Sequence, residues 1–290
     1  MKDILHTYNN LDILCWYNKT APLLTKFLKW KEIASKIIGE KFVLLKRGTK
    51  NKPLYIKDFK YITKKFLKVR ANHHLNEVKK QLNQKQILLR QYFVPRKLVN
   101  FFYACNNEYG NVIDRIFIDI DRQTNSADDA RKVASELIKI IQNDKKFKKL
   151  INWPYKLLTL WTGSSFHIYI CLKKPIDHNF YNKYLSYGKS KENSFPTQRA
   201  KKISEAKKIK VVAGHERKIW VIIIDTSNTP PGKLARAPFS LHIKDFKTID
   251  GITIPVSEEE LWDPKLISKL TKLTPEIIRK NINKYKKILP

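Results

Sequence analysis

Two acidic residues interrupt an apolar segment near the middle of the chain, which reads Ile116-Phe117-Ile118-Asp119-Ile120-Asp121. The segment is typical of a buried β-strand, and alternate residues of a strand point to the same face. Asp119 and Asp121 should therefore lie together, which is unfavourable unless a cation neutralises them. Carboxylate oxygens are the ligands that hard divalent cations prefer, so the pair predicts a metal site. A D-x-D pair also occurs in sugar transferases and in ordinary strand-end turns.

A second segment combines a tight turn with a hydroxyl and an imidazole, in the order Trp161-Thr162-Gly163-Ser164-Ser165-Phe166-His167. Ser165 and His167 are two residues apart, so both point to one face of the strand that begins here. With the free backbone N–H groups of a glycine turn, they can bind a triphosphate. Alternatively, His167 has only a structural role and is hydrogen-bonded at a strand edge. A Ser–His nucleophilic pair is less well supported, because neither an elbow sequence nor a third partner is visible.

A third segment places an acid at the end of the apolar run Trp220–Ile224, followed by a cation and a histidine. Asp225 ends that run, and an acid at the carboxyl end of a buried strand often lines a site. Arg236, Ser240 and His242 follow after a turn. Alternatively, Asp225 only caps the turn that follows it and Arg236 is one surface cation among many.

The chain is strongly basic, with 58 Lys and Arg residues against 26 Asp and Glu residues and a formal net charge of +32 among 290 residues. Such an excess suits a polyanionic partner, which can be DNA, RNA or an anionic membrane surface. A lysine-rich composition can also reflect genome composition or a hot habitat. We favour a polyanionic partner, because the abundance of lysine is not matched by a similar abundance of acidic residues. Clustered acids in a basic chain predict phosphoryl chemistry on a nucleic acid.

The three cysteines, Cys15, Cys105 and Cys171, are far apart and form no C-x-x-C pair. Neither a zinc site nor a disulfide framework is therefore expected. The first residues lack the pattern of a signal peptide, and no apolar stretch is long enough to span a bilayer. We expect an intracellular, cytoplasmic protein that does not contact a membrane.

Hydrophobic periodicity divides the chain into three consecutive regions. Residues 1–95 form a mainly helical, basic region with some strand, 96–257 alternate strands with helices, and 258–290 form C-terminal helices packed on that core. A polar, lysine-rich insertion occupies 175–210. The predicted strands are 43–45, 54–56, 98–105, 115–121, 157–161, 167–172, 218–225 and 253–256; the predicted helices are 75–92, 126–143 and 198–210, with two more closing the chain, the last beginning at Thr274.

In combination, the three segments resemble the motifs of the archaeo-eukaryotic primase superfamily, which includes primase small catalytic subunits and primase-polymerases. The family's motifs are a hydrophobic strand with D-x-D, then S-x-H, then a strand-ending Asp. The last is followed by a basic-x-P-x-S-hydrophobic-His stretch, which here is Arg236-Ala237-Pro238-Phe239-Ser240-Leu241-His242. Order, spacing and local hydrophobicity agree over about residues 97–257.

The resemblance implies an α/β (α+β) catalytic core with an RNA-recognition-like mixed sheet. It implies that two Mg²⁺ or Mn²⁺ ions are held by Asp119, Asp121 and Asp225. The residues implied to contact the incoming nucleotide are Ser165, His167, Arg236, Ser240 and His242. The chemistry would be attack of a 3′-hydroxyl on the α-phosphate, with pyrophosphate leaving.

The sequence departs from the family pattern in two respects. Many relatives place a Gly and a basic residue between the turn of the second motif and its histidine, whereas this chain has a shorter segment there; Lys173, Lys233 or the lysines of the insertion are candidate replacements for the cation. No ligand set is present for the zinc-binding knob of many archaeal relatives. This omission favours a self-standing or element-encoded primase-polymerase over a replicative small subunit.

The expected function is template-dependent synthesis or extension of primers on single-stranded DNA from NTPs or dNTPs. A helicase, a primase large subunit or a CRISPR-associated protein are compatible partners. Two alternatives stay open: a metal-dependent nuclease, and a catalytically silent nucleic-acid-binding subunit. Aromatic residues of the basic regions can stack on bases or fill the core; they are Tyr55, Tyr61, Phe66, Tyr187 and Phe195.

Overall fold

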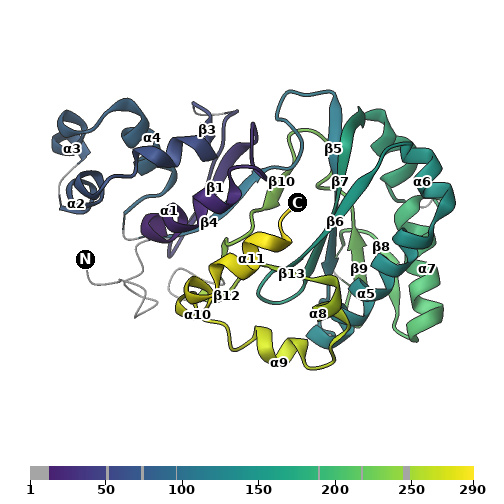
Figure 1. Ribbon diagram of the computed structural model, residues 1–290. Helices are drawn as coiled ribbons and strands as arrows, with labels where there is room; N and C mark the ends of the chain where they lie inside the picture. Colours follow the sequence, from purple (N-terminus) through teal and green to yellow (C-terminus); the bar gives the residue numbers. More distant parts are fainter. Residues whose placement is uncertain are drawn as a thin grey trace. The chain divides into compact units, whose positions relative to one another are not determined.

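The computed structural model describes residues 13–49, 52–72, 75–95, 97–188, 190–216, 218–243 and 249–290. The chain forms two compact units, which Figure 1 draws in sequence colours. Unit 1 contains the described parts of Met1–Ala104, Leu234–Thr253 and Thr274–Lys280; unit 2 contains those of Cys105–Lys233, Ile254–Leu273 and Asn281–Pro290. The units therefore interleave along the chain and differ from the predicted regions 1–95, 96–257 and 258–290. Residues 50 and 51 and the first twelve residues lie outside the described ranges.

Unit 1 is built on an antiparallel sheet in the order β10-β4-β1-β2, with β3 paired to β1. Its strands are β1 Glu32–Ile38, β2 Val43–Lys46, β3 Leu54–Tyr55, β4 Leu98–Ala104 and β10 Leu234–Arg236, and a separate pair joins β11 Leu241–Ile243 to β12 Ile249–Ile252. Pairing of β10 with β4 brings the segment after the third acid into the N-terminal unit, which the linear sequence did not predict.

The helices of unit 1 surround an aromatic core. They are α1 Ile13–Leu24, α2 Lys64–Asn72, α3 Leu75–Gln81, α4 Gln84–Tyr92 and α10 Pro275–Lys280, with a 3₁₀ turn at Ile56–Tyr61. The predicted helix 75–92 is thus two helices. The break has a local cause, because the Asn83 side chain accepts a hydrogen bond from the backbone N–H of Gln86 at 3.0 Å and begins a new helix.

Unit 2 contains a mixed sheet in the order β13-β6-β7-β5-β9-β8. Its strands are β5 Val112–Asp121, β6 Tyr155–Trp161, β7 Phe166–Asp177, β8 Val211–Ala213, β9 Ile222–Asp225 and β13 Ile254–Val256. All neighbours are antiparallel except β8 and β9, which are parallel. The mixed α/β architecture confirms the predicted fold class. The predicted strand 218–225 begins only at Ile222, because Ile219 and Trp220 lie in an exposed turn.

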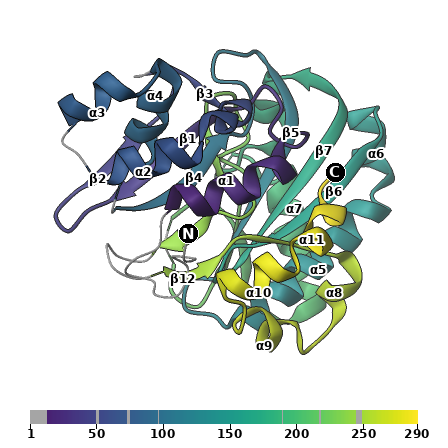
Figure 2. The same cartoon turned by 60° about the vertical axis from the view of Figure 1, so that its left-hand side comes forward.

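Helices α5 and α7 contact strands of this sheet, and Figures 1 and 2 show them on one side of it. The helices of unit 2 are α5 Ala127–Asn143, α6 Lys145–Ile151, α7 Phe195–Lys207, α8 Glu258–Trp262, α9 Leu266–Leu270 and α11 Ile282–Ile288, with a π-helical turn at Tyr181–Leu185. Described residues after Val256 thus form four short helices, α8 to α11, where the sequence predicted two. No helix in the described ranges is long and apolar enough to cross a membrane.

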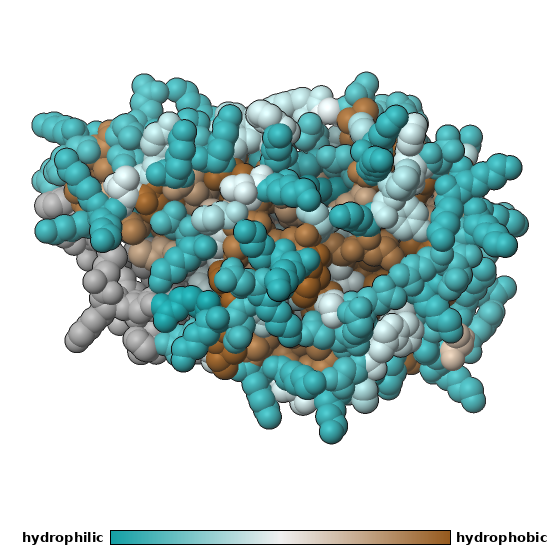
Figure 3. All heavy atoms as spheres, in the orientation of Figure 1, coloured by the Kyte–Doolittle hydropathy of each residue, from teal (hydrophilic) through white to brown (hydrophobic). Residues whose placement is uncertain are grey.

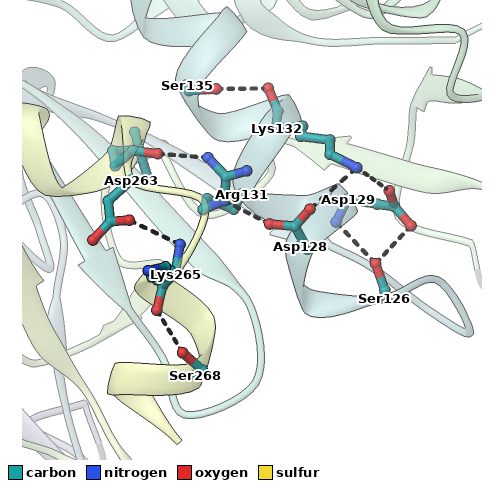
Figure 4. A network of polar contacts seen from close by, with 10 residues as sticks. Ser126, Asp128, Asp129, Arg131, Lys132, Ser135, Asp263, Lys265 and Ser268 are labelled. Atoms are coloured by element: carbon teal, nitrogen blue, oxygen red, sulfur yellow. Dashed lines mark hydrogen bonds and ion pairs between the residues drawn. The ribbon is translucent and has the colours of Figure 1, made fainter.

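The N-terminal part of α5 is tied to α8 (Figure 4). Ser126, the first residue of the predicted helix 126–143, caps α5, and its hydroxyl accepts a hydrogen bond from the backbone N–H of Asp129 at 3.0 Å. Arg131 pairs with Asp128 at 2.6 Å and donates to the backbone carbonyl of Leu261 at 3.0 Å, which anchors the end of α8. A buried guanidinium therefore joins α5 to α8 within one unit.

Asn106 is a buried side chain that joins three segments of unit 2. Its Nδ2 donates to the carbonyls of Arg115, at 2.8 Å, and Thr229, while its Oδ1 accepts from the N–H groups of Asp114 and Arg115 at 2.8 and 3.1 Å. Because Asn106→Ala leaves several buried polar groups unpaired, we expect it to lower the free energy of unfolding by about 2–4 kcal/mol.

Urea denaturation followed by circular dichroism measures this loss. Asn107→Ala is the matched control, since Asn107 is exposed and its replacement should change stability by less than about 0.5 kcal/mol. Equal unfolding midpoints for the two variants would contradict the role of Asn106.

Candidate active site

The strand that carries the first motif lies between the strands that carry the other two. On β5, Asp119 is directly opposite His167 of β7 on one side and Asp225 of β9 on the other. Directly opposed residues of antiparallel strands share a face of the sheet, so these three side chains form one row. Asp121 lies two residues further along β5 and belongs to the same face. Residues more than a hundred positions apart in the chain, Asp119 and Asp225, therefore meet on one face of the sheet.

His167 and Asp119 form a close pair within this row. The His167 Nε2 lies 3.4 Å from Asp119 Oδ1, and the edge of its ring packs against Phe117 with centroids 4.9 Å apart. The His167 side chain is 10% exposed and that of Asp119 is 33% exposed. The imidazole is thus held by packing while the carboxylate stays accessible from solvent.

Asp225 is held by a tyrosine and by its own turn. Its Oδ1 accepts hydrogen bonds from the Tyr187 hydroxyl at 2.8 Å and from the Ser227 N–H at 2.7 Å. Burial, and then the bond to Asp225, raise the pKa of Tyr187 well above its usual range, so its hydroxyl stays a donor. The same hydroxyl lies 3.1 Å from Nδ1 of His215. The sequence indicated Tyr187 only as an aromatic residue for base stacking or core packing, and no motif included His215.

Asp121 accepts two hydrogen bonds from the residue that follows it by two positions. Its Oδ1 accepts from the backbone N–H of Gln123 at 3.1 Å, and its Oδ2 accepts from the Gln123 side chain at 2.7 Å. Gln123 has a φ of 51°, so the aspartate supports a left-handed residue in the turn after β5. The strand-end turn considered for D-x-D is therefore present, on the same face as the other acids.

The turn of the second motif is tied to the strand of the first. The Ser165 hydroxyl donates to the carbonyl of Ile120, which lies between the two acids of β5. Arg122 donates through Nε to the carbonyl of Ser164 at 2.9 Å. Ser165 therefore positions the turn, and its hydroxyl proton is engaged within the protein. Arg122 was missed in the sequence, although it brings a cation to the turn whose expected basic residue is lacking.

The remaining predicted residues belong to unit 1. Arg236 donates through Nη1 to the carbonyl of Leu241 at 3.1 Å and stacks on Phe102 at 5.2 Å. Ser240 is fully buried, and its hydroxyl accepts from the N–H of Phe101 at 2.9 Å. In the structure the Ser240 hydroxyl therefore positions the backbone of β4, and its contact with a nucleotide stays a prediction. His242 lies on β11 and is partly exposed.

The donor types and the register of the three aspartates fit a hard divalent cation, because like charges on opposed strands are unfavourable without one. Among the described residues, however, no three His, Cys, Asp or Glu side chains lie close enough together to hold a metal ion. In this structure Asp121 accepts from Gln123 and Asp225 accepts from Tyr187.

The polymerase domain of ligase D from Mycobacterium tuberculosis, solved in complex with DNA, has a similar structure. The match covers 100% of this chain and 98% of that chain, with a TM-score of 0.59 and 12% sequence identity. The chain has the fold of that polymerase domain. No protein-family model matches the sequence, and no curated protein matches it. At this identity the likeness concerns the fold, and it confirms the predicted α/β fold class.

Thr229 holds the turn after Asp225 against the strand of the first motif. Its buried hydroxyl donates to the carbonyl of Phe117 and accepts from the N–H of Phe117, both at 3.0 Å. Thr229→Val keeps the shape of the side chain but leaves both backbone groups of Phe117 unpaired, so we expect a loss of about 1–3 kcal/mol in unfolding free energy.

Guanidinium chloride denaturation of Thr229→Val beside Thr229→Ser measures this contribution. The serine keeps the hydroxyl and should recover most of the hydrogen-bond contribution. A serine variant less stable than the valine variant would show that packing of the methyl group matters more than the two hydrogen bonds.

Proposed function

We propose that the chain is a template-dependent nucleotidyltransferase, a primase-polymerase that synthesises or extends primers on single-stranded DNA. The observation that carries this proposal is the row of His167, Asp119 and Asp225 across three adjacent strands, with Asp121 on the same face. A row of acids beside a histidine suits reaction at a phosphate. The shared fold with a polymerase domain solved in complex with DNA supports the same chemistry.

In this proposal, Asp119, Asp121 and Asp225 hold two Mg²⁺ or Mn²⁺ ions. Such ions, when bound, lower the pKa of an attacking 3′-hydroxyl and neutralise charge that develops on the α-phosphate and the leaving pyrophosphate. The chain's own contribution is orientation. His167 lies beside Asp119, while Tyr187 and the Ser227 N–H fix one oxygen of Asp225.

The triphosphate is proposed to bind at the turn of the second motif, near His167. Arg122 lies at this turn and carries a charge that complements phosphate oxygens. The contacts of Arg236 and His242 to the triphosphate stay predictions from the family resemblance. The net charge of +32 supports a nucleic-acid partner, and the face in Figure 3 is mostly hydrophilic.

Replacing either opposed acid should abolish the activity. We expect Asp119→Asn and Asp225→Asn each to reduce incorporation at least about 100-fold, because metal binding contributes several kcal/mol to stabilisation of the transition state. The assay supplies NTPs or dNTPs with Mg²⁺ or Mn²⁺ to unprimed single-stranded DNA and, separately, to an annealed primer. Asp177→Asn is the control on the same sheet, since its side chain is 64% exposed at the far end of β7.

A second readout does not depend on turnover. Nucleoside triphosphate with Mn²⁺ should raise the melting temperature of the wild type and of Asp177→Asn, and should raise that of Asp119→Asn less. Degradation of the DNA without any triphosphate would favour the nuclease. DNA binding without synthesis or a triphosphate-dependent shift would favour the silent binding subunit.

A further inference from the structure

Unit 2 contains a groove of about 800 Å³ beside the edge strand β8. One wall is a stripe of α7 at helical spacing, which includes Thr197, Lys201 and Ser204. The opposite wall is the chain from Lys210 to Lys218, including β8. Its volume is within the usual range for a ligand site of a nucleotide's size.

The groove ends beside the candidate active site. Tyr187 and His215 line it, and the Tyr187 hydroxyl bonds to both Asp225, at 2.8 Å, and His215, at 3.1 Å. A molecule in the groove would therefore contact the ring that holds one of the three acids. None of the sequence motifs includes these groove residues.

Its lining combines exposed lysines with an apolar floor. Lys201, Lys210 and Lys218 are exposed, while Val211 and Ala200 contribute apolar surface. Two acids, Glu205 and Glu216, leave the three lysines in excess. Lysines that contact phosphates above an apolar surface for bases and sugars are the usual features of a site for single-stranded nucleic acid.

The order of the β-strands indicates which nucleic-acid strand binds in the groove. His167 and the second-motif turn lie on the β7 side of β5, where the proposed function puts the triphosphate. Asp225, Tyr187 and the groove lie on the other side of β5, toward β9 and β8. The strand whose 3′-hydroxyl attacks must reach the acids without crossing the triphosphate.

We infer that this groove binds the 3′-terminal nucleotides of the primer strand. The inference rests on the proposed function, since it assumes that the acid row is the catalytic centre. The α7 wall, from Thr197 to Glu205, is about 12 Å long at about 1.5 Å per residue. That length accommodates about three stacked nucleotides at about 3.4 Å each.

Filling the groove is the direct test. At Gly214, which lines it, an added Cβ meets no heavy atom within 4 Å, and the backbone is outside the left-handed region. Gly214→Trp can therefore fold and block the groove. We expect the KM for primer–template to rise at least about 10-fold with little change in the KM for nucleotide. Ala206→Trp adds the same ring at an exposed position of α7 outside the groove and should leave both KM values unchanged.

Removal of one charge tests the phosphate contacts. Lys201→Ala should weaken binding of a fluorescent primer–template and reduce the slope of log binding constant against log salt by about 0.7–0.9. Lys202→Ala is the matched control, because Lys202 is the adjacent exposed lysine of α7 and does not line the groove. Equal salt slopes for the two variants would contradict the inference.

Photocrosslinking separates this inference from the proposed function. A primer with 4-thiothymidine at its 3′ end should crosslink to peptides that carry Tyr187, Lys201 or His215, whether or not synthesis occurs. Crosslinks to these peptides in a wild type that shows no synthesis would contradict the proposed catalysis and support primer binding in the groove. An active wild type whose primer crosslinks elsewhere, or whose template end crosslinks here instead, would overturn the groove assignment and retain the catalysis.

Discussion

The pairing of β5 between β7 and β9 is the constraint on which the candidate site depends. It sets Asp119 opposite both His167 and Asp225, and a slip by one residue would move a strand's side chains to the other face. Buried side chains prevent such a slip, because Ile118 and Ile120 are fully buried on the alternate positions of β5. Thr229 on the β9 side and Ser165 on the β7 side add bonds to the backbone of the same strand. The register of β5 is therefore fixed by contacts with both neighbouring strands, β7 and β9.

Neutral donors hold two of the three acids. Gln123 donates to Asp121 through its backbone and its amide, and Tyr187 donates to Asp225 through a hydroxyl whose pKa is raised. A neutral donor orients a carboxylate without cancelling its charge, so the acids keep their attraction for a cation. The cost of opposed like charges thus persists in the folded protein, and a bound divalent ion would relieve it.

Local patterns predicted the strands that carry the motifs, because β5 and β7 are apolar runs with polar residues at their ends. Asn83 and Gln86 form a capping box that was visible in the sequence and explains the break in the predicted helix 75–92. Pairing of β10 with β4 joins residues about 130 positions apart and had no local signal. The contacts of Tyr187 with Asp225 and His215 were hidden for the same reason, since each depends on tertiary folding.

The lysine-rich insertion 175–210 acquires a specific role in this fold. The sequence predicts a helix over 198–210 in this polar segment, and the structure has α7 at Phe195–Lys207. The structure adds the hydrogen bond from Tyr187 to Asp225. Helix α7 packs against the edge strand β8 and its neighbour β9, which carries Asp225. The second motif occupies the opposite side of β5. Asp119 is therefore bordered by two different segments of the chain, the second motif on β7 and, across β9 and β8, the insertion.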